Sequence, residues 1–480
     1  MSLMMNHFLA SVRAIFTNHE KNFRRNLMNN DVNATWPKLP VALKKIAIDP
    51  TSDDYELMCS NYFVTGRPKL ILRATTERDV IASIQYVKKI RENVSHSIPF
   101  SFRSGGHGIS MASVNNGGII LDISQLNSVT VTDAEQGLVQ VQAGAVWGDV
   151  AEALRPFNLI ISSGDFGDTG VGGLATGGGI GLLVRRLGLT IDHIVSARLV
   201  TADGEIRVTD HQKYPDLFWG IRGGNSQLGM VTAFTFKASK LVEKKSDISL
   251  PFTVQTIESQ TSNLTKFIQQ WQSWITQASS KMSSNLMLTA ENRNTVHINA
   301  SNFWAGSINS DAKALFKSAL SLSEVNKHQL ETKSYAELVK APHIPHSGQQ
   351  PVFVKNILLD AMNANIGDII SKILVSPGII GIEMRAIDGP LNTINADETA
   401  WHDRKAKVFL AMWLQKDTEP HAKEVFGPLQ DLGTGVYSSY SSDLSIEESQ
   451  RIWPEETGRK LRKLITKYDP QHLFNQGHYW

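Results

Sequence analysis

A histidine set among glycines is the most chemically informative feature of the 480-residue sequence. The run from Arg103 to Gly108, Arg-Ser-Gly-Gly-His-Gly, follows the apolar stretch 98–102 and precedes a second one at 118–121. Glycine loses more backbone entropy on folding than any other residue, so such a cluster needs a compensating reason. Successive backbone N–H groups can form concavities that hold phosphate. The run therefore indicates either a phosphate-binding turn that presents His107 to the ligand, or a plain glycine turn with an exposed histidine.

A second glycine-rich stretch runs from 164 to 181, where glycine fills nine of 18 positions. Its part 170–175 fits a loose G-x-G-x-x-A pattern with Asp192 about 20 residues later, as in a nicotinamide-binding fold. That fingerprint must lie directly between a strand and a helix, but eight residues separate Ile161 from Gly170, and the later glycines should weaken a helix. Because no G-K-[ST] closes any glycine run, a Walker A site is absent. A purely structural loop stays open, but two such turns favour a long, flat, phosphorylated ligand.

Composition limits the class of protein. The chain is 41% hydrophobic and 20% charged, and about 100–200 residues per domain predict two or three domains. A net charge of +2 without a dense Lys/Arg stripe argues against a nucleic-acid partner. The single cysteine, Cys59, excludes an intrachain disulfide and a cysteine zinc site. We expect Cys59 to be buried as a small hydrophobe, and we expect no metal site.

The N-terminal stretch 1–16 is fairly apolar, but Arg13 interrupts it and no clean cleavage site follows. We interpret it as an amphipathic helix rather than a signal peptide. No uninterrupted apolar run approaches the ~20 residues of a membrane-spanning helix. The sequence therefore predicts a cytoplasmic protein without a membrane span, although four sequons leave secretion open and the oligomeric state is not predicted.

Apolar periodicity predicts an α+β fold. Apolar residues at helical spacing predict a helix over 77–91, and Asp203-Gly204 predicts a hairpin between strands 194–200 and 205–208. After Lys244 glycine becomes rarer, and we expect a second α+β domain of about 180 residues. Further helices are expected at 147–157, 182–187, 264–275, 311–322 and 457–467. Further strands are expected at 70–72, 98–102, 118–121, 139–141, 159–161, 230–236, 286–289, 295–300, 352–354, 379–384 and 408–414.

Several motifs, taken in order, resemble one family. They are Arg-Ser-Gly-Gly-His (103–107), Gly-Ile-Ile-Leu-Asp (118–122), Ala-Gly-Ala-Val-Trp-Gly-Asp-Val (143–150), Asp-Thr-Gly-Val-Gly-Gly-Leu (168–174), Gly-Gly-Gly-Ile-Gly (177–181) and Asp-Leu-Phe-Trp-Gly-Ile-Arg-Gly-Gly (216–224). The set is similar to the berberine bridge enzyme-like FAD-linked oxidases of the vanillyl-alcohol oxidase superfamily. The resemblance covers about 66–240 and resumes at 399–404 and 467–474.

The resemblance implies a domain plan. A two-lobed FAD-binding domain of the PCMH type would span 66–243, with the N-terminal segment 1–65 packed on it. A substrate domain with an antiparallel sheet would span 244–430. The C-terminal segment 431–480 would return to the FAD-binding domain.

The resemblance also implies how FAD is held. His107 would carry it through one covalent bond to the 8α carbon, since Phe166 stands where many members attach the flavin again through cysteine. Thr169 would control the access of dioxygen. Asp192 and Ile194 would lie near the adenine half, with His193 replacing the usual asparagine. The residues assigned to FAD binding are Arg103, Ser104, Gly105, Gly106, His107, Gly108, Asp168, Thr169, Gly170, Gly173, Gly177, Gly178, Gly179, Asp192 and Ile194.

Two tyrosines are the catalytic candidates. The family often has Tyr-x-Asn-Tyr before its last helix, and here Tyr437 and Tyr440 flank Ser438-Ser439. By this resemblance Tyr440 is the base that removes a substrate proton and Tyr437 a neighbouring substrate contact. A tyrosine base needs a pKa lowered from about 10. The alternative is that both tyrosines are half-buried packing residues.

Substrate contacts are expected from the strand 379–384 and its extension. Glu383 and Arg385 alternate there, which suggests a polar substrate, although an edge strand facing solvent would explain them too. Trp401, like Trp304 and Trp413, could stack on a sugar or ring or could belong to the aromatic core. The tail 478–480, His-Tyr-Trp, replaces the family's amide-rich end.

The resemblance thus implies an FAD-dependent oxidoreductase. It would oxidise an alcohol, hemiacetal or amine carbon of a small molecule, and dioxygen would reoxidise the flavin with release of hydrogen peroxide. A dehydrogenase with another electron acceptor and a flavin-binding protein with lost catalysis are the alternatives. The sequence does not identify the substrate.

Overall fold

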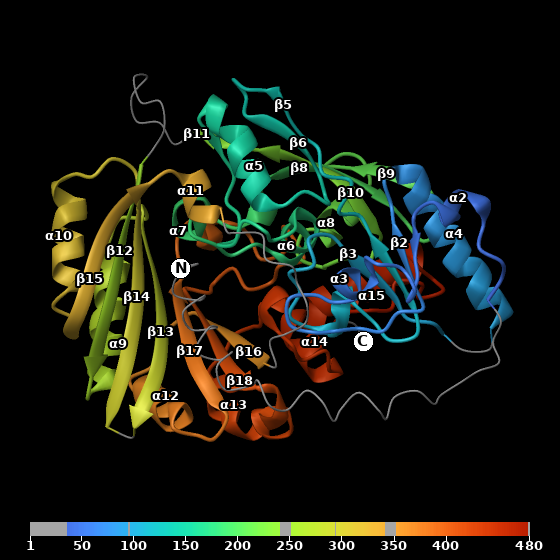
Figure 1. Cartoon of the computed structure of the whole chain (residues 1–480). Helices are drawn as coiled ribbons and strands as arrows, with labels where there is room; N and C mark the ends of the chain where they lie inside the picture. Colours follow the sequence, from blue (N-terminus) through green and yellow to red (C-terminus); the bar gives the residue numbers. More distant parts are fainter. Residues whose placement is uncertain (1–35, 95–96, 241–250, 293, 341–351, 479–480) are drawn as a thin grey trace.

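The computed structural model describes residues 36–94, 97–240, 251–292, 294–340 and 352–478, and the helix expected at 1–16 lies outside them. The described chain forms a four-, a five-, a two- and a seven-stranded sheet with helices around them (Figure 1). The α+β fold class is confirmed. No helix in these residues is long and apolar enough to cross a bilayer.

The first sheet has the strand order β1-β2-β4-β3. Its last three strands are parallel, so β3 and β4 end at one edge. The helix α4 (Glu77–Asn93) connects β2 to β3, and a capping box between Thr76 and Asp79 starts it. Two short helices, α2 (Val41–Lys44) and α3 (Tyr55–Met58), accompany this sheet. The strands are β1 (Ala47–Ile48), β2 (Leu70–Arg73), β3 (Phe100–Arg103) and β4 (Ile119–Asp122).

The second sheet is antiparallel, with the order β5-β6-β10-β8-β9. The predicted hairpin is confirmed, because Val200 pairs with Ile206 across Asp203-Gly204. Its strands are β5 (Val129–Asp133), β6 (Leu138–Gln142), β8 (Ile194–Val200), β9 (Ile206–Thr209) and β10 (Met230–Lys237). β7 (Leu159–Ile160) and β11 (Ser239–Lys240) form the two-stranded sheet, and α5 (Trp147–Leu154) and α8 (Pro215–Gly220) complete this part.

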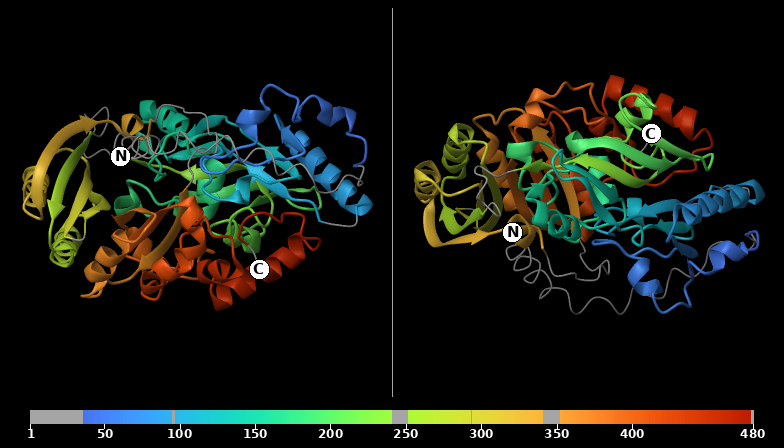
Figure 2. Two further views of the ribbon diagram at one scale, coloured as in Figure 1. Left: turned by 60° about the horizontal axis from the view of Figure 1, so that its bottom comes forward. Right: turned by 90° about the horizontal axis from the view of Figure 1, so that it is seen from above.

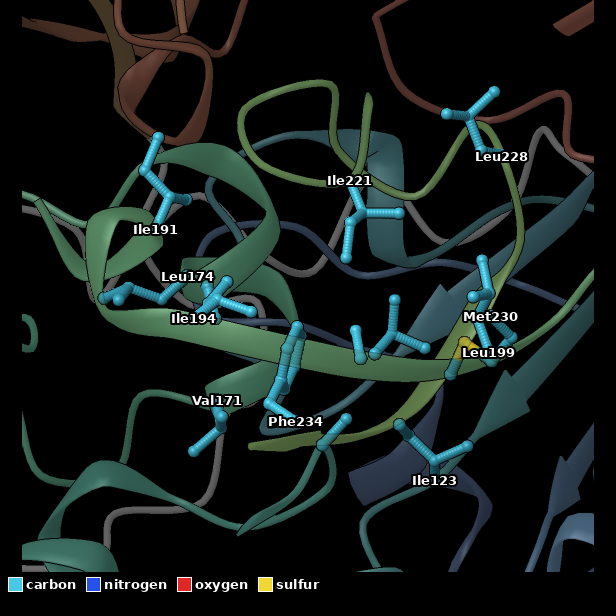
Figure 3. Close-up of a cluster of buried hydrophobic side chains, with 14 of the residues drawn as sticks. Ile123, Val171, Leu174, Ile191, Ile194, Leu199, Ile221, Leu228, Met230 and Phe234 are labelled. Atoms are coloured by element: carbon cyan, nitrogen blue, oxygen red, sulfur yellow. The ribbon is translucent and has the colours of Figure 1, made fainter. Parts of the chain in front are cut away.

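A short helix forms inside the second glycine-rich stretch. The sequence predicted a helix only over 182–187, but the chain is helical at α6 (Val171–Gly177) and again at α7 (Val184–Leu187). Val171, Leu174 and Ala175 are buried, and Val171 and Leu174 lie in the apolar cluster that also holds Phe234 of β10 (Figure 3). Burial of these side chains outweighs the helix penalty of the glycines, which is about 1 kcal/mol each.

The seven-stranded antiparallel sheet has the order β15-β12-β14-β13-β17-β18-β16. The helices α9 (Leu264–Gln277), α10 (Ser310–Ala319), α12 (Ile366–Leu374) and α13 (Ala422–Gln430) share one apolar core with it. α11 (Tyr335–Val339) instead contacts α5. The strands are β12 (Phe252–Thr261), β13 (Met282–Asn292), β14 (Thr295–Ala305), β15 (Glu324–Lys333), β16 (Val352–Leu359), β17 (Ile379–Ala386) and β18 (Val408–Gln415).

The C-terminal segment packs on the first two sheets. Its helices α14 (Ile446–Ile452) and α15 (Glu455–Tyr468) are red in Figure 2, and α15 lies against α8. Arg91 of α4 donates to the carbonyl oxygens of His472 and Leu473 at 2.7 and 3.0 Å. The exact domain bounds stay a prediction, since the connection 241–250 lies outside the described residues.

Candidate active site

One cavity lies where the two first sheets, the seven-stranded sheet and the C-terminal segment meet. Its volume is about 260 Å³, and it is partly open to solvent. The segments that line it are 100–113, 164–176, 225–231, 437–440 and 474–478, together with Arg385 of β17 and Trp413 of β18. The predicted residues Ser104 to Gly108, Thr169, Gly170, Gly173, Arg385, Tyr437 and Tyr440 are therefore brought together.

The turn after β3 is fixed from behind. The Arg103 guanidinium binds the buried Asp122 carboxylate at 2.6 Å. Gly106 adopts φ +70°, and a Cβ there would lie 2.5 Å from the Arg103 guanidinium, so only glycine fits. Within the described residues, the amides of Gly105, Gly106 and Gly108 donate no hydrogen bond to the protein. They are free to bind an anion, as a phosphate-binding turn requires.

His107 lies in the cavity wall at the end of this turn. Its ring stacks on Tyr62 with centroids 4.5 Å apart and planes 11° apart. The Nε2 atom lies 3.4 Å from Asp168 Oδ1, and the side chain is 15% exposed. Phe166, which replaces the family's cysteine, lies 5.4 Å from the imidazole, measured between ring centroids. The histidine is thus oriented from two sides and still reaches the cavity.

The glycines of the two turns serve two purposes. A Cβ on Gly105 would lie 2.5 Å from the Gly170 amide nitrogen, and one on Gly170 would lie 2.2 Å from that of Gly105, so these two allow the turns to touch. Gly173 also lines the cavity, but a Cβ there would meet no protein atom within 4 Å. Space that the protein leaves in front of Gly173, beside free amides, fits a flat phosphorylated group such as FAD.

Other predicted FAD contacts lie outside the cavity lining. A Cβ on Gly177 would clash with Ser439, one on Gly178 with Trp401 and one on Gly179 with Thr190. Protein packing therefore already accounts for these three glycines. Asp192 binds Arg404 through two hydrogen bonds of 2.8 and 2.9 Å, and Ile194 is buried at the start of β8. This placement gives the predicted contacts of Gly177, Gly178, Gly179, Asp192 and Ile194 with FAD no support.

An ionic cluster forms another part of the cavity wall, which includes Asp165 beside Phe166. The Arg385 guanidinium on β17 binds the carboxylates of Asp165 and Glu383. Its remaining nitrogen lies 3.4 Å from the Tyr440 hydroxyl. Although burial alone favours a neutral arginine, the two carboxylates raise the pKa of Arg385. Glu383 and Arg385 are therefore interior residues of a central strand, not residues of a solvent-facing edge.

The surroundings of Tyr440 do not match the sequence prediction. Burial, together with the carboxylates of Glu383 and Asp165, raises the pKa of Tyr440 well above its usual value, against the opposing effect of Arg385. The lowered pKa that a tyrosine base needs is therefore not found for Tyr440 in the protein without a bound group. The reason is that Arg385 is shared with two acids and cannot stabilise a tyrosinate alone.

Tyr437 and Trp401 have roles in packing. The Tyr437 hydroxyl accepts from the amides of Gly179 and Ile180 at 3.3 and 3.4 Å, and burial raises its pKa. Trp401 packs on Tyr437 with centroids 5.2 Å apart and lies outside the cavity lining, whereas Trp413 is part of it. The predicted substrate contact of Trp401 thus has no support in this geometry.

The segment that carries the two tyrosines is fastened to β16. Asn356 exchanges two hydrogen bonds with the backbone of Tyr437, at 2.8 and 3.0 Å. Lys355 binds the carboxylates of Asp443 and Glu448 at 2.7 and 3.2 Å. Tyr440 is therefore held at both ends of its short segment.

Sequence reasoning missed three residues of the cavity. Asp165 lies in the glycine-rich stretch without a motif of its own, and Tyr62 precedes every matched motif. His478 lines the cavity, and its Nε2 atom lies 3.2 Å from the Ser438 carbonyl oxygen. The replaced tail was the only sequence signal for any of them.

Comparisons with known proteins agree with this geometry. Residues 68–210 match the family described as FAD binding domain. The chain thus contains an FAD binding domain and is similar to FAD-linked oxidoreductases. The resemblance drawn from the sequence is thereby confirmed, and the two turns that meet at Gly105 and Gly170 both lie within the matched residues.

Relatives of this oxidoreductase match most of its length. An uncharacterized FAD-linked oxidoreductase of Bacillus subtilis, YgaK, is 25% identical over 432 residues, which cover 85% of this chain and 90% of the relative. The fold is shared with 6-hydroxy-D-nicotine oxidase from Arthrobacter nicotinovorans. The two structures superpose with a TM-score of 0.77 at 22% identity, over 91% of this chain and 98% of the oxidase. It is also shared with glucooligosaccharide oxidase from Acremonium strictum, which carries a 6-S-cysteinyl, 8α-N1-histidyl FAD (TM-score 0.73, 21% identity, covering 90% of this chain and 95% of the oxidase).

Proposed function

We propose that this FAD-linked oxidoreductase is an oxidase of a small molecule. It oxidises an alcohol, hemiacetal or amine carbon, holds FAD through a single 8α bond to His107, and lets dioxygen reoxidise the flavin with release of hydrogen peroxide. FAD would supply the acceptor for the hydride that leaves the substrate carbon. The observation that carries the proposal is that one cavity joins the phosphate-binding turn and His107 to the Arg385–Tyr440 cluster.

The first turn would hold the cofactor. The amides of Gly105, Gly106 and Gly108 would bind the pyrophosphate, since they have no acceptor among the described residues. Gly173 leaves open space for the ring system. Tyr62 and Asp168 would fix the plane of His107 for the covalent bond, and Phe166 offers no second attachment.

Another part of the wall would handle the substrate. Tyr440 is the candidate that accepts a proton from the substrate, because its hydroxyl is close to the cation of Arg385 in the cavity. Its raised pKa means that only a small fraction is deprotonated at neutral pH. A base of this kind contributes about 10²–10⁴-fold to the rate.

Turnover separates the candidate activities. An oxidase consumes dioxygen when substrate is added and releases an equal amount of hydrogen peroxide. A dehydrogenase reduces an added dye but consumes little dioxygen, and a protein with lost catalysis shows no flavin bleaching with any substrate. Thr169 lines the cavity at the position that the resemblance assigns to dioxygen access, and its modest size favours the oxidase.

A further inference from the structure

The substrate end of the cavity carries an excess of negative charge. Asp165, Glu383 and Arg385 are 8%, 3% and 4% exposed, and the single guanidinium faces two carboxylates. His478 adds no cation near neutral pH, because burial lowers its pKa to about 4. Among the described residues that line the cavity, Arg385 is the only arginine or lysine.

One carboxylate oxygen of this cluster is unsatisfied. Asp165 Oδ1 is buried and has no hydrogen-bond partner among the described residues. A buried carboxylate oxygen without a donor costs several times more than an unpaired neutral acceptor. Asp165 also lines the cavity, so a hydrogen-bond donor bound beside it would satisfy this oxygen.

Aromatic rings surround the same end. Phe166 follows Asp165 in the wall, and Trp413 packs edge-on against Tyr440 with centroids 5.9 Å apart. Aromatic faces attract cations and also pack against apolar groups. The wall thus combines a carboxylate oxygen that can accept a hydrogen bond with aromatic surface.

We propose that Asp165 selects a cationic amine as the substrate, with the ammonium group donating to Asp165 Oδ1 and an apolar or aromatic body against Phe166 and Trp413. The inference rests on the proposed function and narrows its substrate class. Asp165 acts here as a specificity-determining residue and takes no part in bond breaking.

Charge balance favours an amine over the other classes. An anionic substrate would add a third negative charge around one guanidinium. A hydroxyl group could donate one hydrogen bond but would leave the excess charge uncompensated. An ammonium group satisfies the oxygen and neutralises the cluster, and charge-assisted hydrogen bonds are about twice as strong as neutral ones.

Matched pairs of ligands test the proposal. Three amines and their alcohol counterparts (benzylamine and benzyl alcohol, cyclohexylmethylamine and cyclohexylmethanol, tyramine and tyrosol) are titrated by calorimetry into the flavin-loaded enzyme. The flavin is reduced beforehand, so no turnover occurs. We expect at least one amine to bind about tenfold or more tightly than its alcohol.

The variant Asp165→Asn keeps the shape and removes the charge. We expect it to weaken amine binding about tenfold or more and to change alcohol binding less than about twofold. Glu383→Gln, which changes no cavity-lining residue, should weaken amine binding by a smaller factor and serves if Asp165→Asn does not fold. Asp417→Asn is the matched control, because it alters an exposed carboxylate of another region. It should change neither amine binding nor alcohol binding.

The outcomes separate this inference from the proposed function. If no amine binds more tightly than its alcohol, or if Asp165→Asn and Glu383→Gln weaken both members of a pair equally, the inference is wrong. Anaerobic flavin bleaching by alcohols alone would support the proposed oxidation of a small molecule and would contradict a cationic amine as the substrate. Amine-selective binding without bleaching by any compound would support Asp165 and contradict the oxidase.

Discussion

At the scale of single residues, Tyr440 should control the rate of substrate oxidation. Tyr440→Phe keeps the ring and removes the hydroxyl beside Arg385, so we expect the anaerobic rate of flavin reduction to fall about 10²–10⁴-fold. Stability should change little. Tyr86→Phe, which removes a hydroxyl bound to the Pro37 carbonyl oxygen, is the control. An unchanged rate in Tyr440→Phe would exclude the tyrosine as the base.

The charge of Glu383 should set the pH dependence of this rate. Burial and the Glu383 and Asp165 carboxylates raise the pKa of Tyr440, while Arg385 opposes them and Tyr437 adds to them. The rate should therefore rise with pH through the neutral and mildly alkaline range, because the deprotonated fraction grows about tenfold per pH unit below the pKa.

Glu383→Gln removes one of these negative charges, so the pKa of Tyr440 should fall and the profile should move to lower pH. The variant would then be faster than the wild type at neutral pH, measured by anaerobic flavin reduction in a pH series. A profile that moves to higher pH, or does not move, would show that Glu383 does not act on Tyr440 through its charge.

Single residues also show where sequence reasoning reaches its limit. His107 was predictable because the glycines around it form a recognisable motif in the sequence. Asp165 was not, since its partner Arg385 is 220 residues away and no spacing rule connects them. The raised pKa of Tyr440 was not predictable for the same reason, because it depends first on burial and then on charges from different segments.

At the scale of elements, the two glycine turns make a direct comparison possible. Gly105→Ala would place a Cβ 2.5 Å from the Gly170 amide, so we expect lower thermal stability and loss of flavin together. Gly173→Ala lies in α6 and meets no protein atom within 4 Å, so we expect a slightly higher melting temperature of the flavin-free protein but lower flavin content. Equal melting temperatures for the two variants would contradict this division.

The elements themselves were predictable where burial is periodic. The amphipathic helix α4 and the hairpin β8–β9 follow from apolar spacing and Asp-Gly. The strand β15 was missed because its side chains are mostly exposed and polar at the edge of the sheet. The helix α6 was missed because the buried Val171 and Leu174 outweigh its glycines, which local propensity does not reveal.

At the scale of the whole molecule, Asp192 should hold two parts of the chain together. Its carboxylate, near β8, makes two hydrogen bonds with Arg404, which lies 3% exposed just before β18. Asp192→Asn leaves a buried guanidinium without its charge partner, so we expect a loss of about 3 kcal/mol in the free energy of unfolding. Flavin content should stay unchanged in urea-free buffer. Loss of flavin at unchanged stability would instead support the contact with the adenine half that the sequence predicted.

The covalent bond to His107 is the central claim, and acid precipitation tests it most directly. The purified wild type and His107→Ala are precipitated with acid, and flavin absorbance is measured in pellet and supernatant, with the mass of the peptide containing His107 as the second readout. We predict that the wild-type flavin stays in the pellet with FAD on that peptide, and that any flavin of the variant passes to the supernatant. Wild-type flavin in the supernatant, or pelleted flavin in the variant, would contradict the account.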